Sequence, residues 1–414
     1  MRIGIIGCGV AGQAAAIGLA RAGHDVSIFE RFPQARPLGA GLLLQPSGLA
    51  ALDCLGLRSD VERWGAPVER LDGRTTNGRK VLDLHYKGEQ GLGVHRATLF
   101  RVLHEALIAS QTRLVLNFET HAIENPAAPA LISADGRREG PFDLVINAAG
   151  AHDRLRHSLG GRVRDPLYPW GALWATCSDR SGAFARALRQ VYRHCDTMIG
   201  ILPVGRLPES DGEQVAFFWS LPLSEYDAQK ALGIDALRKK VVALWPAAEP
   251  IVSQIPSFDE MSLATYRDVS LQPIRHGRVV TIGDAAHGTS PQLGQGANLS
   301  LIDAVTLTHC VRSSADIARA LEDYERKRRR HVAFYRTASR WLTPVFQSNS
   351  RAVAFARDML MAPGRHLPGA DYLMRTTLSG VRCLPWGLWR LPTDQTPAAP
   401  AARPEIPHNT RIRQ

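Results

Sequence analysis

Cysteine is scarce in this sequence, and its few copies are scattered. Six cysteines occur in 414 residues, with no CxxC pair and no cluster of cysteine and histidine. This pattern excludes a recognisable zinc site or disulfide framework, so we expect no bound metal and a reducing, cytoplasmic setting. Long apolar runs are missing as well: no stretch reaches about 18 consecutive apolar residues, so we expect no transmembrane helix. The N-terminal apolar residues alternate with the glycines of a motif, so we expect no signal peptide.

Acidic residues are fewer than basic ones. The sequence has 39 Asp and Glu and 50 Lys and Arg, which gives a formal net charge of +11. Such a surface can attract nucleic acid or an anionic membrane. No nucleic-acid-binding motif accompanies the charge, and much of it lies in diffuse arginine, in residues 325–336 and in the C-terminal tail. We therefore expect no nucleic-acid partner.

The sequence does contain a strand–helix–strand pattern at its N-terminus. Residues 2–6 form a short apolar run that predicts a buried strand. Residues 11–23 are rich in alanine and end on a glycine, which predicts a helix and its stop. Residues 25–30 form a second apolar run that ends on an acid. Three glycines lie where the first strand turns into the helix, which is the arrangement of a dinucleotide-binding βαβ unit.

Each conserved type of residue in such a turn has a physical task. Gly7 would make the tight turn, Gly9 would let a pyrophosphate approach the backbone, and Gly12 would let the helix pack against the strand. The helix N-terminus offers free N–H groups and a positive dipole end to the phosphates. Glu30, 18 residues after Gly12, can accept hydrogen bonds from a ribose hydroxyl. An acid at this position favours the free ribose diol of NAD or FAD over a 2′-phosphate.

A second glycine-rich stretch lies far downstream, at residues 277–307. Residues 279–282 predict a strand, and a helix is expected to begin near Asn298 after a loop with several glycines. Asp284, at the end of the strand, could bind a sugar or ribityl hydroxyl. The helix N-terminus would favour negative charge, which a reduced flavin carries on its pyrimidine edge.

The two stretches resemble motifs of the FAD-dependent single-component (group A) flavoprotein monooxygenases of the aromatic hydroxylase type. GCGVAG through Glu30 resembles their adenosine-binding motif, and GDAAHGTSPQLGQGAN (283–298) resembles their second FAD motif. Shorter stretches at 35–48, 94–103 and 323–330 support the resemblance, which spans about residues 1–345.

This resemblance implies FAD as the cofactor and NADH or NADPH as a transient reductant. The implied FAD-binding residues are Gly7, Gly9, Val10, Ala11, Gly12, Glu30, Arg31, Arg36, Gly41, Arg96, Asp284, Pro291, Gly294, Gln295, Gly296, Ala297 and Asn298. No second strand–GxGxxG–helix unit is present, so we expect no separate NAD(P)H domain. One position departs from the family: Ala149 stands where the family has an aspartate linked to FAD and nicotinamide binding. Asn147 and Asp153 are the nearby candidates to compensate.

We expect a mixed α/β (α+β) fold, with a Rossmann-like FAD-binding domain on a parallel sheet, an inserted substrate domain with an antiparallel sheet, and C-terminal helices. The expected boundaries are 1–70, 96–160 and 275–345 for the FAD-binding domain, 71–95 and 161–274 for the substrate domain, 346–392 for a helical cap and 393–414 for a disordered tail. Strands are expected at 79–86, 168–177, 197–205 and 214–222, and a helix at 224–245.

One face of the antiparallel sheet is expected to line a largely apolar pocket. Candidates for its lining are Trp170, Trp174, Phe218 and Trp219, with Pro203 and Pro291 near the flavin ring. A phenolic substrate would need a base near its hydroxyl, although some family members use no protein base. The sequence offers Tyr192, His194, Tyr168 and His287, each of which also has an ordinary structural explanation. The catalytic candidates are therefore His194, Tyr192 and Pro291.

The resemblance implies an FAD-dependent, NAD(P)H-consuming monooxygenase (hydroxylase). It would act through a flavin hydroperoxide and insert one oxygen atom of dioxygen into an aromatic, phenolic, quinone-like or otherwise lipophilic small molecule. An FAD-dependent reductase or dehydrogenase of the same fold, acting on a lipophilic substrate, stays open. So does a flavin-binding protein that has lost catalysis, which the alanine at position 149 would favour. We expect a monomer or a homodimer.

The C-terminal part is less informative. Residues 342–346 and 355–361 are loosely similar to ubiquinone-pathway hydroxylases, and the run 379–392 mixes tryptophan, leucine and arginine. This composition suits a peripheral membrane contact. It equally suits a segment that caps the pocket or forms a dimer surface.

Overall fold

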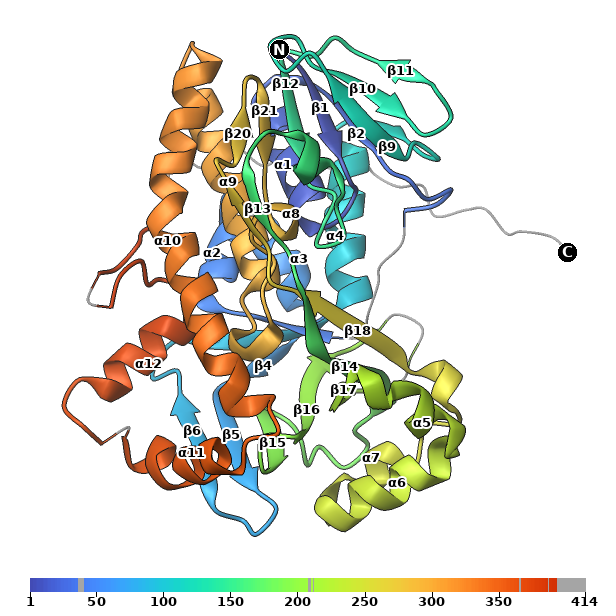
Figure 1. The fold of residues 1–414 in the computed structure, drawn as a ribbon, viewed down its shortest axis with the longest axis vertical. Coiled ribbons are helices and arrows are strands. Elements are labelled where there is room, and N and C mark those ends of the chain that lie inside the picture. Colours follow the sequence, from blue (N-terminus) through green and yellow to red (C-terminus); the bar gives the residue numbers. More distant parts are fainter. Residues whose placement is uncertain (36–40, 208–209, 211, 365, 386, 393–414) are drawn as a thin grey trace, which may run out of the picture.

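The computed structural model describes residues 1–35, 41–207, 210, 212–364, 366–385 and 387–392. It confirms the mixed α/β fold: a parallel sheet lies at one end of the molecule and a mostly antiparallel sheet at the other, with helices beside both (Figure 1). Within these ranges, no helix combines the length and the hydropathy that a bilayer crossing requires.

The first end is built on a six-stranded sheet in which the edge strand β20 alone runs antiparallel to its neighbour. Its strands, in spatial order, are β20 (Arg275–His276), β21 (Val279–Thr281), β12 (Leu144–Asn147), β1 (Arg2–Ile6), β2 (Asp25–Phe29) and β8 (Arg113–Val115). The predicted strand–helix–strand unit is confirmed as β1, α1 (Val10–Arg21) and β2. Both strands are buried after their first residue, because the sheet is covered on its two faces.

Helices cover one face of this sheet and a small sheet covers the other. On the helical face, α1 packs against α4 (Arg96–Ala109) and α9 (Gly296–Arg312). On the opposite face lies an antiparallel sheet of β11 (Arg138–Glu139), β10 (Ala130–Ser133) and β9 (Thr120–Glu124). The carboxyl ends of the parallel strands therefore open toward the middle of the molecule.

The second end is a seven-stranded sheet that is antiparallel except for the pairing of β15 with β5. Its strands, in spatial order, are β18 (Ser262–Arg267), β14 (Leu167–Ser178), β17 (Gln214–Pro222), β16 (Thr197–Gly205), β15 (Ala187–Arg193), β5 (Arg70–Thr75) and β6 (Lys80–His85). The four strands predicted in this region are confirmed as β6, β14, β16 and β17.

The predicted single helix at 224–245 is wrong in one respect. The segment forms two helices, α5 (Tyr226–Ala231) and α6 (Gly233–Leu244). They break at Gly233, whose φ of +80° is a conformation that continues no right-handed helix. Leu237 and Val241 of α6 pack against the outer face of the sheet.

Shorter elements join the two ends. The strands are β3 (Gly41–Leu44), β7 (Gly91–His95) and β4 (Ala66–Val68) in one sheet and β13 (Arg162–Arg164) with β19 (Ser270–Gln272) in another. The helices are α2 (Pro46–Cys54), α3 (Arg58–Glu62), α7 (Glu249–Val252) and α8 (Asp284–His287).

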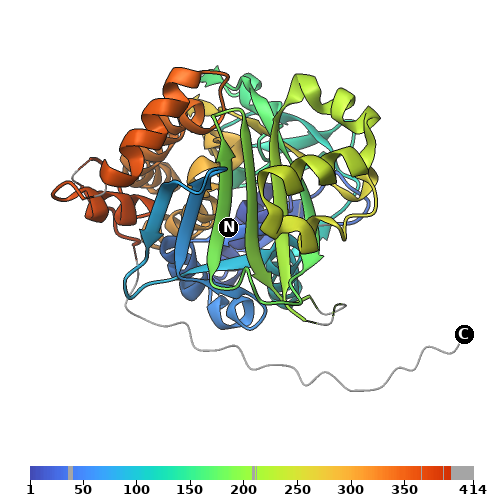
Figure 2. The same cartoon turned by 90° about the horizontal axis from the view of Figure 1, so that it is seen from below.

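Three C-terminal helices flank both ends of the molecule. The long helix α10 (Ile317–Phe346) runs from the parallel sheet to the antiparallel one (Figure 1). Seen from below, α11 (Arg351–Gly364) and α12 (Ala370–Leu378) lie beside the β5–β6 edge, and α6 lies toward the other edge (Figure 2). The following run packs inward: Trp389 stacks on His331 at 4.4 Å and donates a hydrogen bond to Lys327 O. Leu384 and Leu388 of the same run are 46% and 48% exposed, so the described part of the run packs inward only in part.

A buried carboxylate fastens three of these elements together. Asp303 of α9 accepts hydrogen bonds from Gly283 N at 2.8 Å, His287 Nε2 at 2.5 Å and Arg328 Nε at 2.6 Å. Asp303 is fully buried and Arg328, on α10, is 1% exposed. Burial alone would raise the pKa of Asp303, but His287, Arg328 and the Gly283 N–H hold it well below its usual range.

We expect Asp303→Asn to lower the free energy of unfolding by about 3–5 kcal/mol, because it leaves the Arg328 guanidinium buried without a counter-ion. Urea denaturation at neutral pH measures the loss. The folded-state pKa is depressed, so the difference from wild type should persist down to about pH 3.9, the pKa of an unfolded aspartate, and shrink below it. The control is Asp323→Asn, which removes an exposed partner of Arg326 and should cost less than about 1 kcal/mol. Equal losses in the two variants would contradict the assignment.

Candidate cofactor and substrate site

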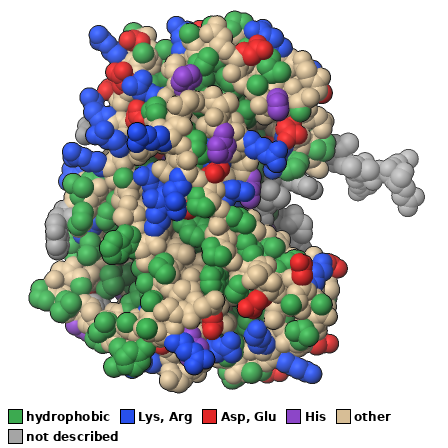
Figure 3. Space-filling model, in the orientation of Figure 1, with side chains coloured by type: hydrophobic (Ala, Val, Ile, Leu, Met, Phe, Trp, Pro, Cys, Tyr) green, Lys and Arg blue, Asp and Glu red, His purple; other side chains and the backbone are tan. Residues whose placement is uncertain are grey.

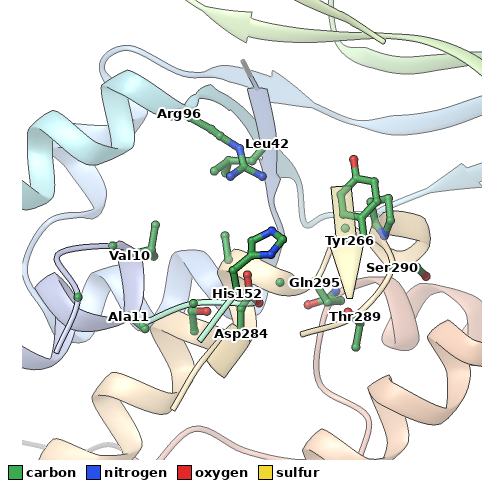
Figure 4. Close-up of a pocket in the computed structure, with 18 of the residues that line it drawn as sticks. Val10, Ala11, Leu42, Arg96, His152, Tyr266, Asp284, Thr289, Ser290 and Gln295 are labelled. Atoms are coloured by element: carbon green, nitrogen blue, oxygen red, sulfur yellow. The ribbon is translucent and has the colours of Figure 1, made fainter. Parts of the chain in front are cut away.

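A cavity of about 850 Å³ lies between the two ends of the molecule. Its lining comes from the carboxyl ends of β1, β2 and β12, from the first residues of α4, α8 and α9, and from one face of the seven-stranded sheet. In the close-up, Arg96, His152 and Asp284 point into the same space from three different elements (Figure 4). Sequence segments that lie far apart thus converge on one site.

The first glycine turn has the geometry that its sequence predicted. Gly7 has a φ of +95°, and a Cβ there would lie 2.6 Å from Ala148 O. A Cβ at Gly12 would lie 1.9 Å from Gly7 O, so helix and turn could not pack as they do. By contrast, a Cβ at Gly9 would meet no atom of the described residues within 4 Å. Gly9 therefore leaves room for a ligand beside the N-terminus of α1, which no side chain caps.

Glu30 closes the other side of this turn. Its Oε2 accepts a hydrogen bond from Cys8 N at 2.9 Å, and its Oε1 accepts one from Phe32 N at 3.2 Å. The carboxylate is thereby fixed at the wall of the cavity, with lone pairs left for a ribose hydroxyl. Burial and the nearby Glu30 charge raise the pKa of the Cys8 thiol to about 12, so Cys8 is an unreactive packing residue.

The second glycine stretch forms the opposite wall. Asp284 is the first residue of α8 and lines the cavity. Pro291 opens a short turn that ends at Gly294, whose φ of +60° is left-handed. Gly296 begins the 17-residue helix α9, whose N-terminus also has no side-chain cap. Backbone N–H groups and a positive helix end thus face the cavity, and these suit an anionic edge of a flat ligand.

The structure brings most of the expected FAD-binding residues to the cavity. Those that line it are Gly7, Gly9, Val10, Ala11, Glu30, Arg31, Gly41, Arg96, Asp284, Pro291, Gly294, Gln295, Gly296 and Ala297. Gly12 and Asn298 lie behind the lining. Asn298 is fully buried, donates to Leu43 O and Gly294 O, and accepts from Gln45 N, so it positions the wall. Arg36 lies outside the described residues.

The loop around Ala149 is held by its own polar residues. Asn147 Nδ2 donates to Asp153 Oδ2 at 2.8 Å, and Asn147 Oδ1 accepts from Ala149 N at 3.2 Å. Both side chains are buried and shape the loop. His152 lines the cavity beside them, a residue that the sequence reasoning missed. Partial burial and then the charge of Arg267 lower the pKa of His152, which favours a neutral imidazole.

The inner face of the seven-stranded sheet forms the far end of the cavity, which we call the substrate chamber. Its sheet residues are Leu71, Leu82, Ala172, Trp174, Leu188, Gln190, Tyr192, Met198, Leu202, Phe218 and Tyr266, and Phe346 and Gln347 of the α10 end complete it. The Trp174 and Phe218 rings lie 4.8 Å apart. Trp219 points to the outer face, under Lys240, because successive strand residues alternate. Trp170 and Pro203 are not among the lining residues.

The described residues of the substrate chamber include polar side chains but no charged one. Tyr192 donates a hydrogen bond to Gln190 Oε1 at 2.9 Å, and Gln347 Nε2 donates to Ser220 Oγ at 2.8 Å. Trp174 Nε1 donates to Tyr266 Oη at 3.4 Å. Burial raises the pKa of both Tyr192 and Tyr266, so both phenols are neutral near pH 7. Gln190 could have been found from the sequence, two residues before Tyr192 on the same strand face.

The other candidate bases lie elsewhere. His194 is exposed in the β15–β16 turn, where it has a φ of +52°, and it does not line the cavity. Its position contradicts the expected role as a base. His287 is buried against Asp303, and Tyr168 is also not among the lining residues. Of the three catalytic candidates, Tyr192 and Pro291 reach the cavity.

Comparison with known proteins identifies what the chain is similar to. Residues 1–337 match a family model described as FAD binding domain. The FAD-dependent urate hydroxylase of Klebsiella pneumoniae subsp. pneumoniae is 27% identical, over 79% of this chain and 86% of that protein. The 3-amino-4-hydroxybenzoate 2-monooxygenase of Streptomyces cremeus is 29% identical, over 87% of this chain and 91% of that protein.

A solved structure shows the same fold. Klebsiella pneumoniae HpxO, crystallised with FAD and uric acid, superposes with a TM-score of 0.76. The match covers 92% of this chain and 97% of that one at 23% identity.

Substitutions at two glycines distinguish space that is left for a ligand from space that the protein needs for its own packing. Gly9→Val fills space that no atom of the described part of the chain occupies, so we expect unchanged stability without ligand and FAD binding weakened by at least about tenfold. Gly12→Ala should lower stability as well, because its Cβ meets Gly7 O. Thermal melting and FAD titration measure the two effects. Wild-type FAD affinity in Gly9→Val would refute this placement of the cofactor.

Proposed function

This chain belongs to the FAD binding domain family, as a monooxygenase of the aromatic hydroxylase type, and we propose that its substrate is a neutral aromatic, phenolic or quinone-like molecule. We also propose that NADH or NADPH is the reductant. The observation that carries the proposal is the substrate chamber, whose described residues carry no charge and which belongs to the same cavity as the two glycine motifs.

The residues present fit FAD. Gly9 leaves open space at the N-terminus of α1 for a pyrophosphate, and Glu30 is fixed where a ribose hydroxyl would lie. Asp284 and the N-terminus of α9 would face the flavin end. FAD bound by these residues would supply the redox chemistry that activates dioxygen for insertion of one oxygen atom into the substrate.

The chamber residues bind, orient and exclude water. Trp174, Phe218 and Tyr192 offer flat apolar surface to an aromatic ring. Gln190, held by Tyr192, offers a fixed amide to a polar substituent. A carboxylate would lose its hydration without gaining a cation, which is costly in an apolar enclosure. Two described cations lie nearby. Arg357 lies over the Tyr192 ring at 4.9 Å, is not a lining residue and is paired with Asp358. Arg96 lines the cavity outside the chamber, at the cofactor end.

No group suited to act as a base near neutral pH lines the described chamber. Tyr192 and Tyr266 are held neutral by burial, and the glutamines do not ionise. We infer that the chamber orients a substrate that is already electron-rich, and that any deprotonation follows the ionisation of the substrate itself.

The activity is tested with the FAD-loaded protein, NADH or NADPH, isotopically labelled dioxygen and paired neutral and carboxylate aromatics. We expect neutral members to stimulate NAD(P)H oxidation, to incorporate one labelled atom, and to bind at least about tenfold more tightly than the acids. Turnover without dioxygen would instead indicate a reductase. A lack of turnover with every neutral compound would favour a protein that only binds flavin.

A charge introduced into the chamber should reverse the preference. Gln190→Arg is expected to strengthen carboxylate binding by at least about tenfold relative to the neutral partner. Gln229→Arg, on α5 outside the cavity, is the matched control and should leave the preference unchanged. Flavin absorbance titration measures both. A preference that stays the same in Gln190→Arg would remove Gln190 from the substrate site.

Tyr192 is expected to position substrate without taking its proton. Tyr192→Phe frees Gln190 from its hydrogen bond, so we expect KM to rise by about two- to tenfold. The pH profile of kcat should keep its shape, because the neutral phenol does not titrate in the neutral range. Steady-state kinetics across pH checks this. If one limb of the profile vanishes, Tyr192 is a base after all.

A further inference from the structure

Helix α11 presents its apolar side chains to solvent. Its exposed residues are Arg351 at the start and then Ala352, Phe355, Ala356, Met359, Leu360 and Pro363. These positions recur at steps of three and four, so they form one continuous stripe along the helix. Phe355 is 69% exposed and Leu360 is 68% exposed. A helix on the surface of a globular protein ordinarily turns such a stripe inward.

The inward side of α11 is held by a charged residue instead. Arg357 is buried, with its guanidinium 4.9 Å from the Tyr192 ring and 5.7 Å from the Phe346 ring. It donates hydrogen bonds to Asp358 Oδ1 at 2.7 Å and to Val345 O at 3.2 Å. The apolar stripe is therefore not what attaches α11 to the protein, and its exposure needs another explanation.

Helix α10, which contacts α11, carries further exposed apolar and basic residues. Trp341 is 78% exposed. Arg330 lies eleven residues, or three turns, before Trp341 on the same side of α10, and Arg329 is beside it. Neither arginine has an acidic partner within ion-pair distance in the part of the chain that the structure describes. We call the α11 stripe, Trp341, Arg329 and Arg330 the docking face.

The charge around the docking face is one-sided. Residues 317–364 contain ten Lys or Arg and four Asp or Glu. All four acids are already paired with arginines, Glu322 and Glu325 with Arg275 among them. Hydrophobic side chains gather at the lower left, over α11 and α12, and Lys and Arg lie above them along α10 (Figure 3).

We propose that the docking face binds the surface of an anionic lipid membrane. An apolar stripe bordered by unpaired arginines matches a surface with an acyl region beneath anionic headgroups. A second copy of this chain fits less well, because a two-fold contact would bring the same arginines toward each other. The site differs from the tryptophan-rich run at 379–392, whose Trp389 is partly buried and stacks on His331.

The docking face lies next to the substrate chamber. Met361 of α11 packs in one cluster with Val81, Tyr192, Phe218 and Phe346, three of which line the chamber. Helix α11 thus separates the chamber from the proposed lipid surface. If the proposed function holds, a neutral lipophilic substrate dissolved in that membrane would be a few side chains away from the chamber.

Vesicle binding tests the proposal with the full chain and without substrate. We expect the protein to co-sediment with vesicles of phosphatidylcholine and phosphatidylglycerol, to bind pure phosphatidylcholine at least about tenfold more weakly, and to dissociate as salt is raised. Because no turnover is measured, failure here is distinct from failure of the proposed monooxygenase activity.

Matched variants locate the contact. Phe355→Ser with Leu360→Ser should weaken vesicle binding by at least about tenfold, while Leu232→Ser, 65% exposed beside α6, should not. Arg329→Glu with Arg330→Glu should do the same, while Lys239→Glu on α6 should not. Thermal melting confirms that each variant is folded.

Two results would overturn the proposal. One is vesicle binding that is absent in the wild type or equal in all folded variants. The other is a dimer in solution that Phe355→Ser with Leu360→Ser converts to a monomer, which would assign the docking face to a second copy of this chain.

Discussion

The buried carboxylate of Asp303 is the point on which the arrangement of the site depends. It fixes both ends of α8, through Gly283 just before the helix and His287 at its last residue, and it fixes α10 through Arg328. The first contact sets where Asp284 enters the cavity. The second sets the direction of a 30-residue helix whose far end delivers Phe346 and Gln347 to the substrate chamber. One buried ion pair thus links the cofactor end of the cavity to its substrate end. The cost of removing these charges from water is offset because both carboxylate oxygens of Asp303 accept hydrogen bonds.

Much of the cofactor end could be predicted from the sequence because its constraints are local. Gly7 and Gly12 are required by backbone contacts within one turn, and Glu30 ends the strand that follows. Such contacts join residues that are close in sequence, so the spacing of a motif is enough to predict them. Asn298 shows the limit: it follows a glycine-rich loop, yet its amide is used on Leu43 and Gln45, more than 250 residues away in sequence. Nothing near position 298 signals that pairing.

The substrate chamber was less predictable because it is assembled from all seven strands of one sheet and the end of one helix. Strand alternation correctly separates Phe218 from Trp219, but it cannot decide which face is the inner one. His194 was predicted as a base because it is a histidine two residues after Tyr192, but the β15–β16 turn exposes it to solvent. The orientation of helix α11 could not be predicted from its pattern. An apolar stripe normally indicates the buried face of a helix, whereas the structure buries Arg357 and exposes Phe355.

Arg357 has a consequence beyond anchoring its helix. The guanidinium that lies over Tyr192 also opposes the effect of burial on that phenol. Any molecule that pushes the Tyr192 ring aside must therefore disturb Arg357, and with it the seating of α11. Ligand binding in the chamber and the position of α11 are therefore thermodynamically coupled. By reciprocity, a contact that shifts α11 from outside changes the affinity of the chamber for its ligand.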